Sequence, residues 1–256
     1  ALEAAIRVAK IGVFLTICAG RPARYQRTRY EIARMAARAR LHERSELAVL
    51  RRLLRPGHVA LDVGANYGVY TRAMSELVGP SGEVHAFEPQ SDVIEVLRSE
   101  LAATPGVHLV NAGVSDAPGW ATVRVPRILG IAPEPARASI RSVPIPHDPR
   151  SPGIVEIITL DDYCEGFERV DFVKVDAEGH DAAVLRGARH MLSRYRPIVQ
   201  VEAMDVDDDV RRGWSTFGYR PYVVLGGTLV EYDLAAARAR RRYNVYLLPP
   251  GRTPVA

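Results

Sequence analysis

A glycine-containing turn between two apolar runs constrains this chain more than any other feature. The first run, Val59–Val63, carries Asp62 and leads directly into the turn Gly64–Gly68, and the second, Val84–Phe87, ends in Glu88. Glycines let the backbone approach a ligand closely, and a helix that follows such a turn points its free N–H groups at that ligand. The pattern predicts a nucleoside site on an α/β sheet, in which Glu88 accepts hydrogen bonds from two ribose hydroxyls.

The turn differs from the dinucleotide-binding fingerprint G-x-G-x-x-G. Asn66 and Val69 stand where that fingerprint needs glycines, which disfavours a nicotinamide dehydrogenase. The pattern D-x-G-x-N-x-G instead resembles the first motif of class I S-adenosylmethionine (AdoMet) methyltransferases.

Strand and helix patterns alternate along the chain after residue 56. Strand patterns fall at 59–63, 84–87, 107–110, 172–175, 198–201 and 244–248, and helix patterns at 67–78, 92–103, 182–192 and about 206–217. This alternation favours a parallel sheet with helices on both faces. The runs Tyr222–Leu225 and Tyr243–Leu248 are typical of a terminal antiparallel hairpin. We therefore expect an α/β, Rossmann-like sheet that is mostly parallel and has an antiparallel last strand.

Two segments fall outside this alternation. Residues 1–55 are rich in Ala, Leu and Arg and predict an N-terminal helical extension, a substrate lid or oligomer contact, ahead of a catalytic domain at 56–256. A proline-rich insertion at about 126–153 separates two further β runs, and loops of such length are usually functional or disordered.

The composition of the chain indicates which partners and which cellular compartment to expect. The net charge is only +4, and every basic residue except Lys10 and Lys174 is arginine, so the sequence lacks the dense lysine and aromatic stripe expected for a nucleic-acid partner. Cys18 and Cys164 match no metal spacing and are expected to be free thiols in a reducing cytoplasm. The apolar run Ile11–Ala19 is shorter than the roughly 20 residues that span a bilayer. We expect it to pack on the domain or a partner, with weak membrane-surface contact as the alternative.

Further motifs follow in a fixed order. They are Asp62–Asn66, Phe87–Pro89, Asn111–Asp116, Thr159–Asp162, Val170–Gly179, Val184–Ala188 and Arg196–Glu202. This ordered set resembles the FkbM family of AdoMet-dependent methyltransferases. The resemblance implies O-methylation of a hydroxyl on a small-molecule or glycan acceptor: a sugar, a glycolipid or polysaccharide, or a polyketide-type secondary metabolite. It does not reach the N-terminal helices or the insertion, where substrate choice is expected to lie.

The resemblance also implies a set of residues that bind AdoMet. Methyl transfer from AdoMet would leave S-adenosylhomocysteine as the product. The cofactor's methionine end would meet Asp62 and the turn, its ribose Glu88, and its adenine the segment beginning at Asn111, while Thr71 could reach the methionine carboxylate. The complete expected set is Asp62, Gly64, Ala65, Asn66, Gly68, Thr71, Glu88, Pro89 and Asn111. The simpler alternative is that Asp62 is a turn acid and Glu88 caps a helix.

An alcohol is a weak nucleophile and needs a base or a metal. Asp176 and Glu202 end strands expected to be neighbours, so they could share Mg²⁺. Alternatively, Asp176 binds the cofactor or caps a helix, and Glu202 pairs with an arginine. Candidate bases besides Asp176 are His147 in the insertion, His180 at a helix start and Tyr67 in the turn. The sequence does not choose among them.

Enzymes that methylate exocyclic amines of nucleobases carry N/D-P-P-Y after the fourth strand. Residues 176–179 here read Asp-Ala-Glu-Gly, which favours an oxygen acceptor. The leading hypothesis is therefore a cytoplasmic AdoMet-dependent O-methyltransferase, with a homodimer through the N-terminal helices as one option. Methylation of a carboxylate or amine, and a cofactor-binding scaffold without turnover, remain alternatives.

Overall fold

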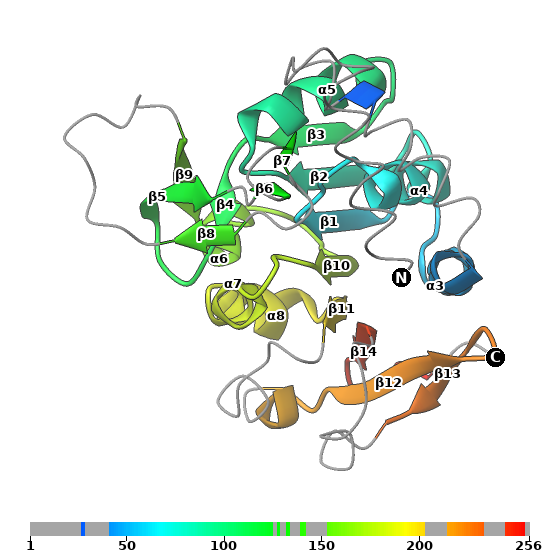
Figure 1. Ribbon diagram of the computed structural model, residues 1–256. Coiled ribbons are helices and arrows are strands. Elements are labelled where there is room, and N and C mark those ends of the chain that lie inside the picture. The colour runs from blue at the N-terminus through cyan, green and yellow to red at the C-terminus, as the bar shows by residue number, and fades with distance from the viewer. Residues whose placement is uncertain are drawn as a thin grey trace.

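The computed structural model describes residues 27–28, 41–124, 127–128, 132–133, 139–141, 153–202, 214–232 and 244–253. Within these residues the centre of the molecule is an eight-stranded sheet with the strand order β13-β12-β14-β11-β10-β1-β2-β3 (Figure 1). The strands are β1 Val59–Val63, β2 Glu83–Phe87, β3 Val107–Val110, β10 Phe172–Val175, β11 Ile198–Glu202, β12 Arg220–Leu225, β13 Thr228–Glu231 and β14 Asn244–Leu248. All six principal strand predictions are confirmed.

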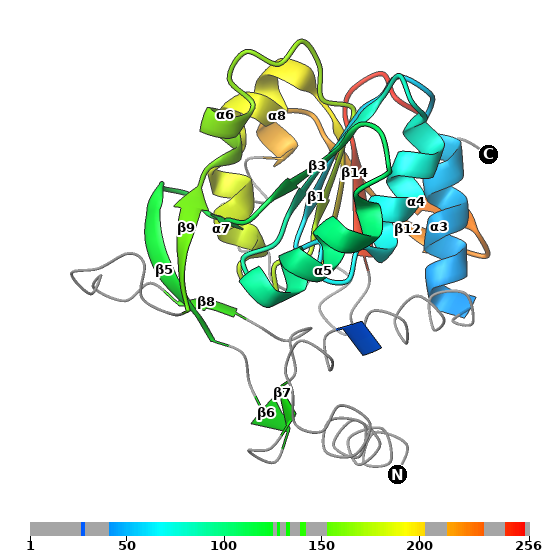
Figure 2. The same ribbon diagram turned by 90° about the horizontal axis from the view of Figure 1, so that it is seen from above.

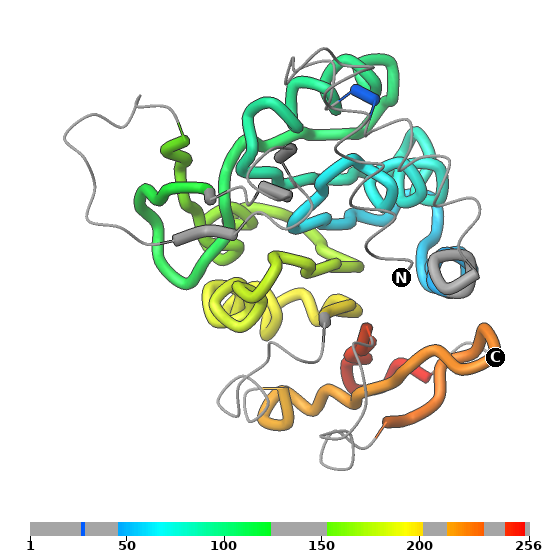
Figure 3. The backbone as a smooth tube through the Cα atoms, viewed as in Figure 1, coloured from blue at the N-terminus to red at the C-terminus, as the bar shows by residue number. Residues whose placement is uncertain are grey.

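The sheet is mostly parallel, and its last strand runs in the opposite direction. Neighbouring strands from β3 through β2, β1 and β10 to β11 pair in parallel, whereas β14 pairs antiparallel with both β11 and β12. The predicted antiparallel pair is confirmed as neighbours, but it is not a hairpin. The chain turns at Gly226-Gly227, and β13 pairs with β12; β14 follows later in the sequence (Figure 3). The sequence interpretation missed β13, a four-residue strand with one buried side chain.

Helices cover both faces of the sheet (Figure 2). One face carries α3 Leu41–Leu53, α4 Val69–Val78 and α5 Ser91–Leu101; the other carries α6 Leu160–Tyr163, α7 Asp181–Arg186 and α8 Arg189–Tyr195. The strands are apolar on both sides, as a doubly covered sheet requires. In β1, for example, Leu61 and Val63 belong to the core beneath α6–α8, whereas Ala60 packs beneath α3 and α4.

The helix predicted over 182–192 is two helices. Gly187 ends α7, and a Cβ at this position would lie 2.0 Å from the backbone oxygen of Ser115. The glycine thus permits a close approach between the α7–α8 junction and the segment after β4. The predicted helix over 206–217 falls largely on residues outside the described part; residues 214–216 are helical.

A small sheet stands beside the main one, with the order β4-β9-β5-β8 (Figure 1). Its strands are β4 Gly113–Val114, β5 Gly119–Arg124, β8 Ser139–Arg141 and β9 Ile154–Ile158. This confirms the two extra β runs. The insertion predicted as a loop at 126–153 contains β8 and the short pair β6 Arg127–Ile128 and β7 Ala132–Pro133; its other residues lie almost wholly outside the described part.

The described part of the N-terminal extension includes α3, which packs on α4 and β12. The boundary at residue 55 and an oligomer contact through residues 1–55 stay predictions. Cys164 is a buried free thiol, and Cys18 lies outside the described residues. No helix in the described ranges is both long and apolar enough to cross a bilayer.

Candidate functional site

A pocket opens where β1, β2 and β10 end, at the carboxyl edge of the parallel strands. In open α/β sheets this edge is where ligands bind. Four chain segments line it: Val63, Gly64, Asn66, Phe87, Glu88, Pro89, Gln90, Ala112, Gly113, Val114, Asp176, Ala177 and Glu178. The first motif, the residues at the end of β2 and the Asp-Ala-Glu segment are therefore brought together, as the sequence predicts.

The turn after β1 is held in a conformation that needs its glycine. Gly64 has φ +78°, and a Cβ there would lie 2.0 Å from the Asp176 carbonyl oxygen. The N–H groups of Gly64 and Ala65 both donate to the Phe87 carbonyl at 3.0 Å. Asn66 follows with φ 47°, a left-handed conformation that asparagine tolerates better than most residues. The turn is thus fixed against the ends of both neighbouring strands.

Glu88 is buried at the pocket wall and already accepts hydrogen bonds there. Its Oε2 accepts from the Asn66 N–H at 2.9 Å, and its Oε1 accepts from the Gln90 N–H at 2.9 Å and the Gln90 side chain at 3.2 Å. Burial raises the pKa of Glu88 to about 7 in spite of these bonds. Each carboxylate oxygen has two lone pairs, so a lone pair on Oε2 is not used by these bonds.

Asn111 supports this wall and is not a lining residue. Its Nδ2 donates to the backbone oxygens of Glu88 and Pro89 at 2.9 and 3.2 Å, and its Oδ1 accepts from Ser91 Oγ at 3.0 Å. The residues that face the pocket are its successors at 112–114. Of the segment expected to meet the adenine, residues 112–114 thus line the pocket, whereas Asn111 shapes the Glu88–Pro89 turn.

Thr71 also has a different partner from the one expected. Its Oγ1 donates to Asp62 Oδ2 at 2.6 Å, and both residues are fully buried. A hydroxyl in this bond orients the Asp62 carboxylate and does not reach toward a ligand. Desolvation raises the pKa of Asp62, against the lowering effect of the nearby Lys174 ammonium.

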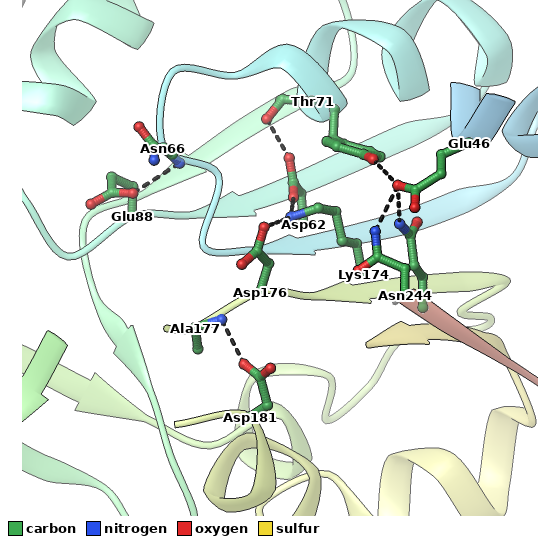
Figure 4. Close-up of polar contacts among 12 residues, drawn as sticks. Glu46, Asp62, Asn66, Thr71, Glu88, Lys174, Asp176, Ala177, Asp181 and Asn244 are labelled. Carbon is green, nitrogen blue, oxygen red and sulfur yellow. Dashed lines mark hydrogen bonds and ion pairs between the residues drawn. The ribbon is translucent and has the colours of Figure 1, made fainter. Parts of the chain in front are cut away.

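Lys174 is the main residue that sequence reasoning missed. Its Nζ lies 3.1 Å from Asp176 Oδ2 and 3.7 Å from Asp62 Oδ1 (Figure 4). The same ammonium lies 4.8 Å from the centroid of the Tyr70 ring. Although burial alone would lower it, the two carboxylates keep the pKa of Lys174 above its ordinary value. The signal in the sequence was a charged residue inside a four-residue apolar strand, in a chain with only one other lysine, Lys10.

The register extends this polar cluster across the sheet. Asp62 pairs with Lys174 and Lys174 with Gln200, so these side chains share one face. On that face Glu46 Oε2 of α3 accepts hydrogen bonds from Tyr70 Oη at 2.5 Å, Gln200 Nε2 at 3.4 Å and Asn244 Nδ2 at 2.6 Å. Figure 4 shows Glu46 and Asn244 at one end of the group and Asp176 at the other.

Among the predicted bases, Asp176 lines the pocket itself, and His180 stands beside residues that line it. His180 precedes α7, and its Nε2 lies 2.8 Å from Ser115 Oγ. Ser115 follows the lining residue Val114, and His180 itself stands two positions after the lining residue Glu178. Burial lowers the pKa of His180, so its imidazole is neutral at neutral pH.

The other predicted catalytic residues do not gain support from their positions. Tyr67 is buried in the apolar cluster with Val93 and Leu97 of α5 and is not a lining residue. His147 lies outside the described residues. Glu202 ends β11 beside β10, as expected from the register of Val175 with Val201; its side chain is outside the described part.

The hydrogen-bond acceptors at this pocket are suited to AdoMet. Asn66 lines the pocket, and its Oδ1 is a buried acceptor without a hydrogen bond from the described residues. An ammonium group such as that of the cofactor's methionine end would satisfy such an atom. Asp62 Oδ1 is fully buried, and the Lys174 ammonium lies 3.7 Å from it. Glu88 offers a carboxylate for ribose hydroxyls. The strand order, the antiparallel β14 and this pocket together define the class I AdoMet-dependent methyltransferase fold.

Comparison with known families agrees. The Methyltransferase FkbM domain matches residues 62–221, and the chain belongs to this family. The comparison with curated proteins gave no match.

Among solved structures, the chain is similar to the methyltransferase FkbM from Methylobacillus flagellatus KT, at 15% identity and a TM-score of 0.49 over 77% of this chain and 49% of that one. It thus spans about half the length of that protein. A SAM-dependent O-methyltransferase from Thermotoga maritima has 14% identity and a TM-score of 0.42, covering 82% of this chain and 65% of that one. Fibrillarin from Aeropyrum pernix with bound S-adenosyl-L-methionine has 16% identity and a TM-score of 0.43, covering 79% and 73%.

Proposed function

We propose that this chain is an AdoMet-dependent O-methyltransferase that acts on a hydroxyl of a sugar, a glycolipid or polysaccharide, or a polyketide-type metabolite. The observation that carries the proposal is the composition of one pocket wall. Asp176 lines the pocket with 43% of its side chain exposed, together with a turn and a buried glutamate suited to the cofactor. Family membership supports methyl transfer, and the Asp-Ala-Glu-Gly segment in place of N/D-P-P-Y favours oxygen as the acceptor atom.

Four groups of residues would hold the cofactor. Glu88 would accept hydrogen bonds from the ribose hydroxyls, residues 112–114 would contact the adenine, and the Asn66 oxygen would face the methionine end, with the buried Asp62 behind the turn. Gly64 leaves the space that this approach needs. When bound, the cofactor supplies an electrophilic methyl group. Much of the acceleration in such a reaction comes from positioning, which can be worth roughly 7–11 kcal/mol in ideal cases.

Asp176 and His180 have separate roles in this proposal. The Asp176 carboxylate accepts a hydrogen bond from the acceptor hydroxyl and orients its oxygen, while Lys174 holds that carboxylate in place. His180 would take the hydroxyl proton as the oxygen bonds to the methyl group and the cofactor's S–CH₃ bond breaks, with S-adenosylhomocysteine as the leaving group, because its neutral imidazole is a competent base. Ser115 Oγ donates to Asp116 Oδ1 at 3.1 Å, so it accepts from His180 Nε2–H at 2.8 Å; this bond would orient the ring and leave Nδ1 as its basic nitrogen.

Mg²⁺ at Asp176 and Glu202 is the alternative way to activate the hydroxyl. Their strands are neighbours, yet Lys174 already places an ammonium 3.1 Å from Asp176 Oδ2. A divalent ion bound to this carboxylate would be repelled by that charge. We therefore expect turnover to persist after EDTA treatment. Loss of turnover on chelation, with recovery in Mg²⁺, would instead support the metal arrangement.

The decisive experiment is an acceptor screen with S-adenosylhomocysteine release and product mass as readouts. The proposal expects a gain of one methyl group on a hydroxyl-bearing sugar, glycolipid or polyketide. Asp176→Asn should lower kcat much more than it changes cofactor affinity, and Glu88→Gln should weaken cofactor binding. Turnover only on carboxylates or amines would move the activity to another acceptor. Cofactor binding without turnover on any acceptor class would favour the scaffold alternative.

Residues 1–55 are proposed to act as a lid or a dimer contact. Because Glu46 is hydrogen-bonded to the sheet, a truncation that tests this role should remove residues 1–40 and keep α3. Gel filtration of the full chain and the truncated variant separates the roles. A dimer that becomes a monomer supports the contact, and an unchanged size with altered acceptor KM supports the lid.

A further inference from the structure

A second group of ligating side chains lies on the face of the sheet that carries α6, away from the pocket. Glu83 and His85 are two residues apart on β2, so both side chains project from the same face. His108 on β3 is the register partner of His85. Their potential ligand atoms all lie within 4.8 Å of one another.

We propose that Glu83, His85 and His108 form a binding site for one divalent transition-metal ion, with Zn²⁺ as the favoured ion. Two imidazoles, one carboxylate and an open fourth position form a donor set that Zn²⁺ uses widely. Non-haem Fe²⁺ sites share this donor set, so the common chemistry is that of a borderline divalent metal. Water completes the coordination shell in our proposal.

The present distances are close to those of a tetrahedral site. Donor atoms about 2.0–2.1 Å from Zn²⁺ lie about 3.3 Å apart in a tetrahedron. Glu83 Oε2 lies 3.1 Å from His85 Nε2 and 3.7 Å from His108 Nε2. The two rings stack with centroids 4.5 Å apart and an angle of 15°. His108 therefore has to tilt toward its neighbour, and its half-exposed side chain has room to do so.

The surroundings of His85 support a ligand role. Its Nδ1 lies 2.9 Å from Tyr163 Oη, and its ring contacts Phe167 with a centroid distance of 5.0 Å. An Nδ1–H donated to this hydroxyl leaves Nε2 as the coordinating atom, the arrangement in which an outer partner fixes the tautomer and direction of a metal-bound imidazole. His85 is buried, whereas Glu83 and His108 are about half exposed. The site thus has a fixed inner ligand and a solvent entrance.

The position of the site indicates a structural ion. Glu83 and His85 lie five and three residues before Glu88, which follows the end of β2, so they are about 16 and 10 Å from it along the strand at roughly 3.3 Å per residue. Such a separation excludes direct action of this ion on the transferred methyl group. β3 is the outermost strand on its side of the main sheet. An ion bound to both strands would join this edge strand to β2.

The test uses the full chain, treated with EDTA and desalted, then titrated with ZnCl₂ by calorimetry and thermal unfolding. The proposal expects one Zn²⁺ per chain and a higher Tm on binding. Glu83→Gln and His108→Ala should each weaken Zn²⁺ binding by about tenfold or more. Tyr163→Phe should weaken it about 10- to 100-fold, the scale for outer-shell partners. His190→Ala, an exposed histidine on α8, should bind Zn²⁺ as well as the unaltered chain does.

Two readouts keep the outcome decisive. Glu83 and His108 are half exposed, so their variants should fold, and S-adenosylhomocysteine binding should be unchanged in both. Co²⁺ added in place of Zn²⁺ should give the intense visible bands of a four-coordinate ion. Absence of a Zn²⁺-dependent Tm rise, or equal Zn²⁺ affinity in the Glu83→Gln, His108→Ala double variant, would overturn the site.

Discussion

Lys174 Nζ lies 3.1 Å from Asp176 Oδ2, and this ion pair connects the buried face of the sheet to the pocket (Figure 4). Asp176 is 43% exposed, whereas the lysine side chain is only 5% exposed. The ammonium therefore belongs to the core, and the carboxylate belongs to the site. Asp62, on the other side of Lys174, is fully buried. One cation thus serves a carboxylate that the fold must neutralise and another that the proposed chemistry uses.

Lys174→Met should destabilise the protein by about 3–5 kcal/mol at pH 7, because it leaves the buried Asp62 carboxylate uncompensated. Without the lysine, the pKa of Asp62 in the folded state rises further. Stability is then regained as the pH falls through that folded-state pKa, since protonation removes the unpaired charge. Chemical denaturation at pH 7 and pH 5 checks this. Asp176→Asn is the control: it should cost less, and equal deficits for Lys174→Met at both pH values would contradict the explanation.

Glu88→Gln should weaken S-adenosylhomocysteine binding by about 1.5–3 kcal/mol, the scale for hydrogen bonds to a charged group. Because ribose hydroxyls donate to the ionised carboxylate, affinity in the unaltered chain should rise with pH through about 7, the pKa of Glu88, and binding should release protons. Titration calorimetry in buffers of different ionisation enthalpy measures both effects. Glu95→Gln, an exposed change on α5, should match the unaltered chain. A flat pH dependence would rule out Glu88 as the titrating group.

Glu88 should also affect folding stability. Its folded-state pKa of about 7 lies above the ordinary value of 4.5. Its contribution is therefore fully present below about pH 4.5 and is lost as the pH rises to about 7, a change of about 3 kcal/mol. Glu88→Gln should remove this slope. The measurement is the unfolding free energy between pH 4.5 and 8 for both proteins, and parallel curves would show that the carboxyl does not titrate as described.

Gly64→Ala should disrupt the cofactor turn more than the loss of flexibility alone predicts. A residue with a Cβ at φ +78° carries a strain of about 1–2 kcal/mol, and here the Cβ would meet the Asp176 carbonyl oxygen at 2.0 Å. We expect lower Tm and loss of S-adenosylhomocysteine binding. Gly79→Ala is the matched control, since it has φ +64° but no atom within 4 Å of the added Cβ. Equal effects at both glycines would contradict the close-approach argument.

His180→Asn should lower kcat and leave cofactor affinity near its original value, if His180 is the base. Burial lowers the pKa of His180 below 6.5 in the free protein. The rate therefore should rise with pH through that lowered value and level off above about 6.5. The acidic limb of kcat/KM should disappear in the variant. Persistence of the same limb would assign the proton transfer to another group.

Much of the fold and part of the pocket wall could be predicted because the relevant signals are local. Apolar runs of strand length identified β1, β2, β3, β10, β11 and β14. Acids after strand ends identified Glu88 and Asp176, which line the pocket, whereas Asp62 is fully buried. The direction in which a side chain points could not be predicted from these local patterns. Thr71 and Asn111 stand at positions suited to a ligand, yet each makes its hydrogen bonds within the protein wall. Residues 112–114, which line the pocket, were expected only as part of the segment that begins at Asn111, because they carry no polar signal of their own.

The polar cluster on the α3 and α4 face depends on register and could not be seen locally. Lys174 and Gln200 are 26 residues apart, but neighbouring strands place them side by side. Glu46 joins them from α3, more than 120 residues earlier in the chain. It is 154 residues away from Gln200, to which it is hydrogen-bonded. The only local hint was a polar residue inside an otherwise apolar run, Lys174 in β10 and Gln200 in β11. Pairing requires the topology as well as the pattern.

The position of β14 has a consequence for the order in which the molecule can form during synthesis. The β12–β13 hairpin is made first, but its link to the rest of the main sheet runs through β14, which pairs with β11 on one side and β12 on the other. The β12–β13 hairpin is therefore synthesised before β14, the strand that joins it to the main sheet. Until β14 has been synthesised, both β11 and β12 present an unpaired edge. The interval between the synthesis of β12 and that of β14 is therefore one in which these strands need protection from pairing with other chains.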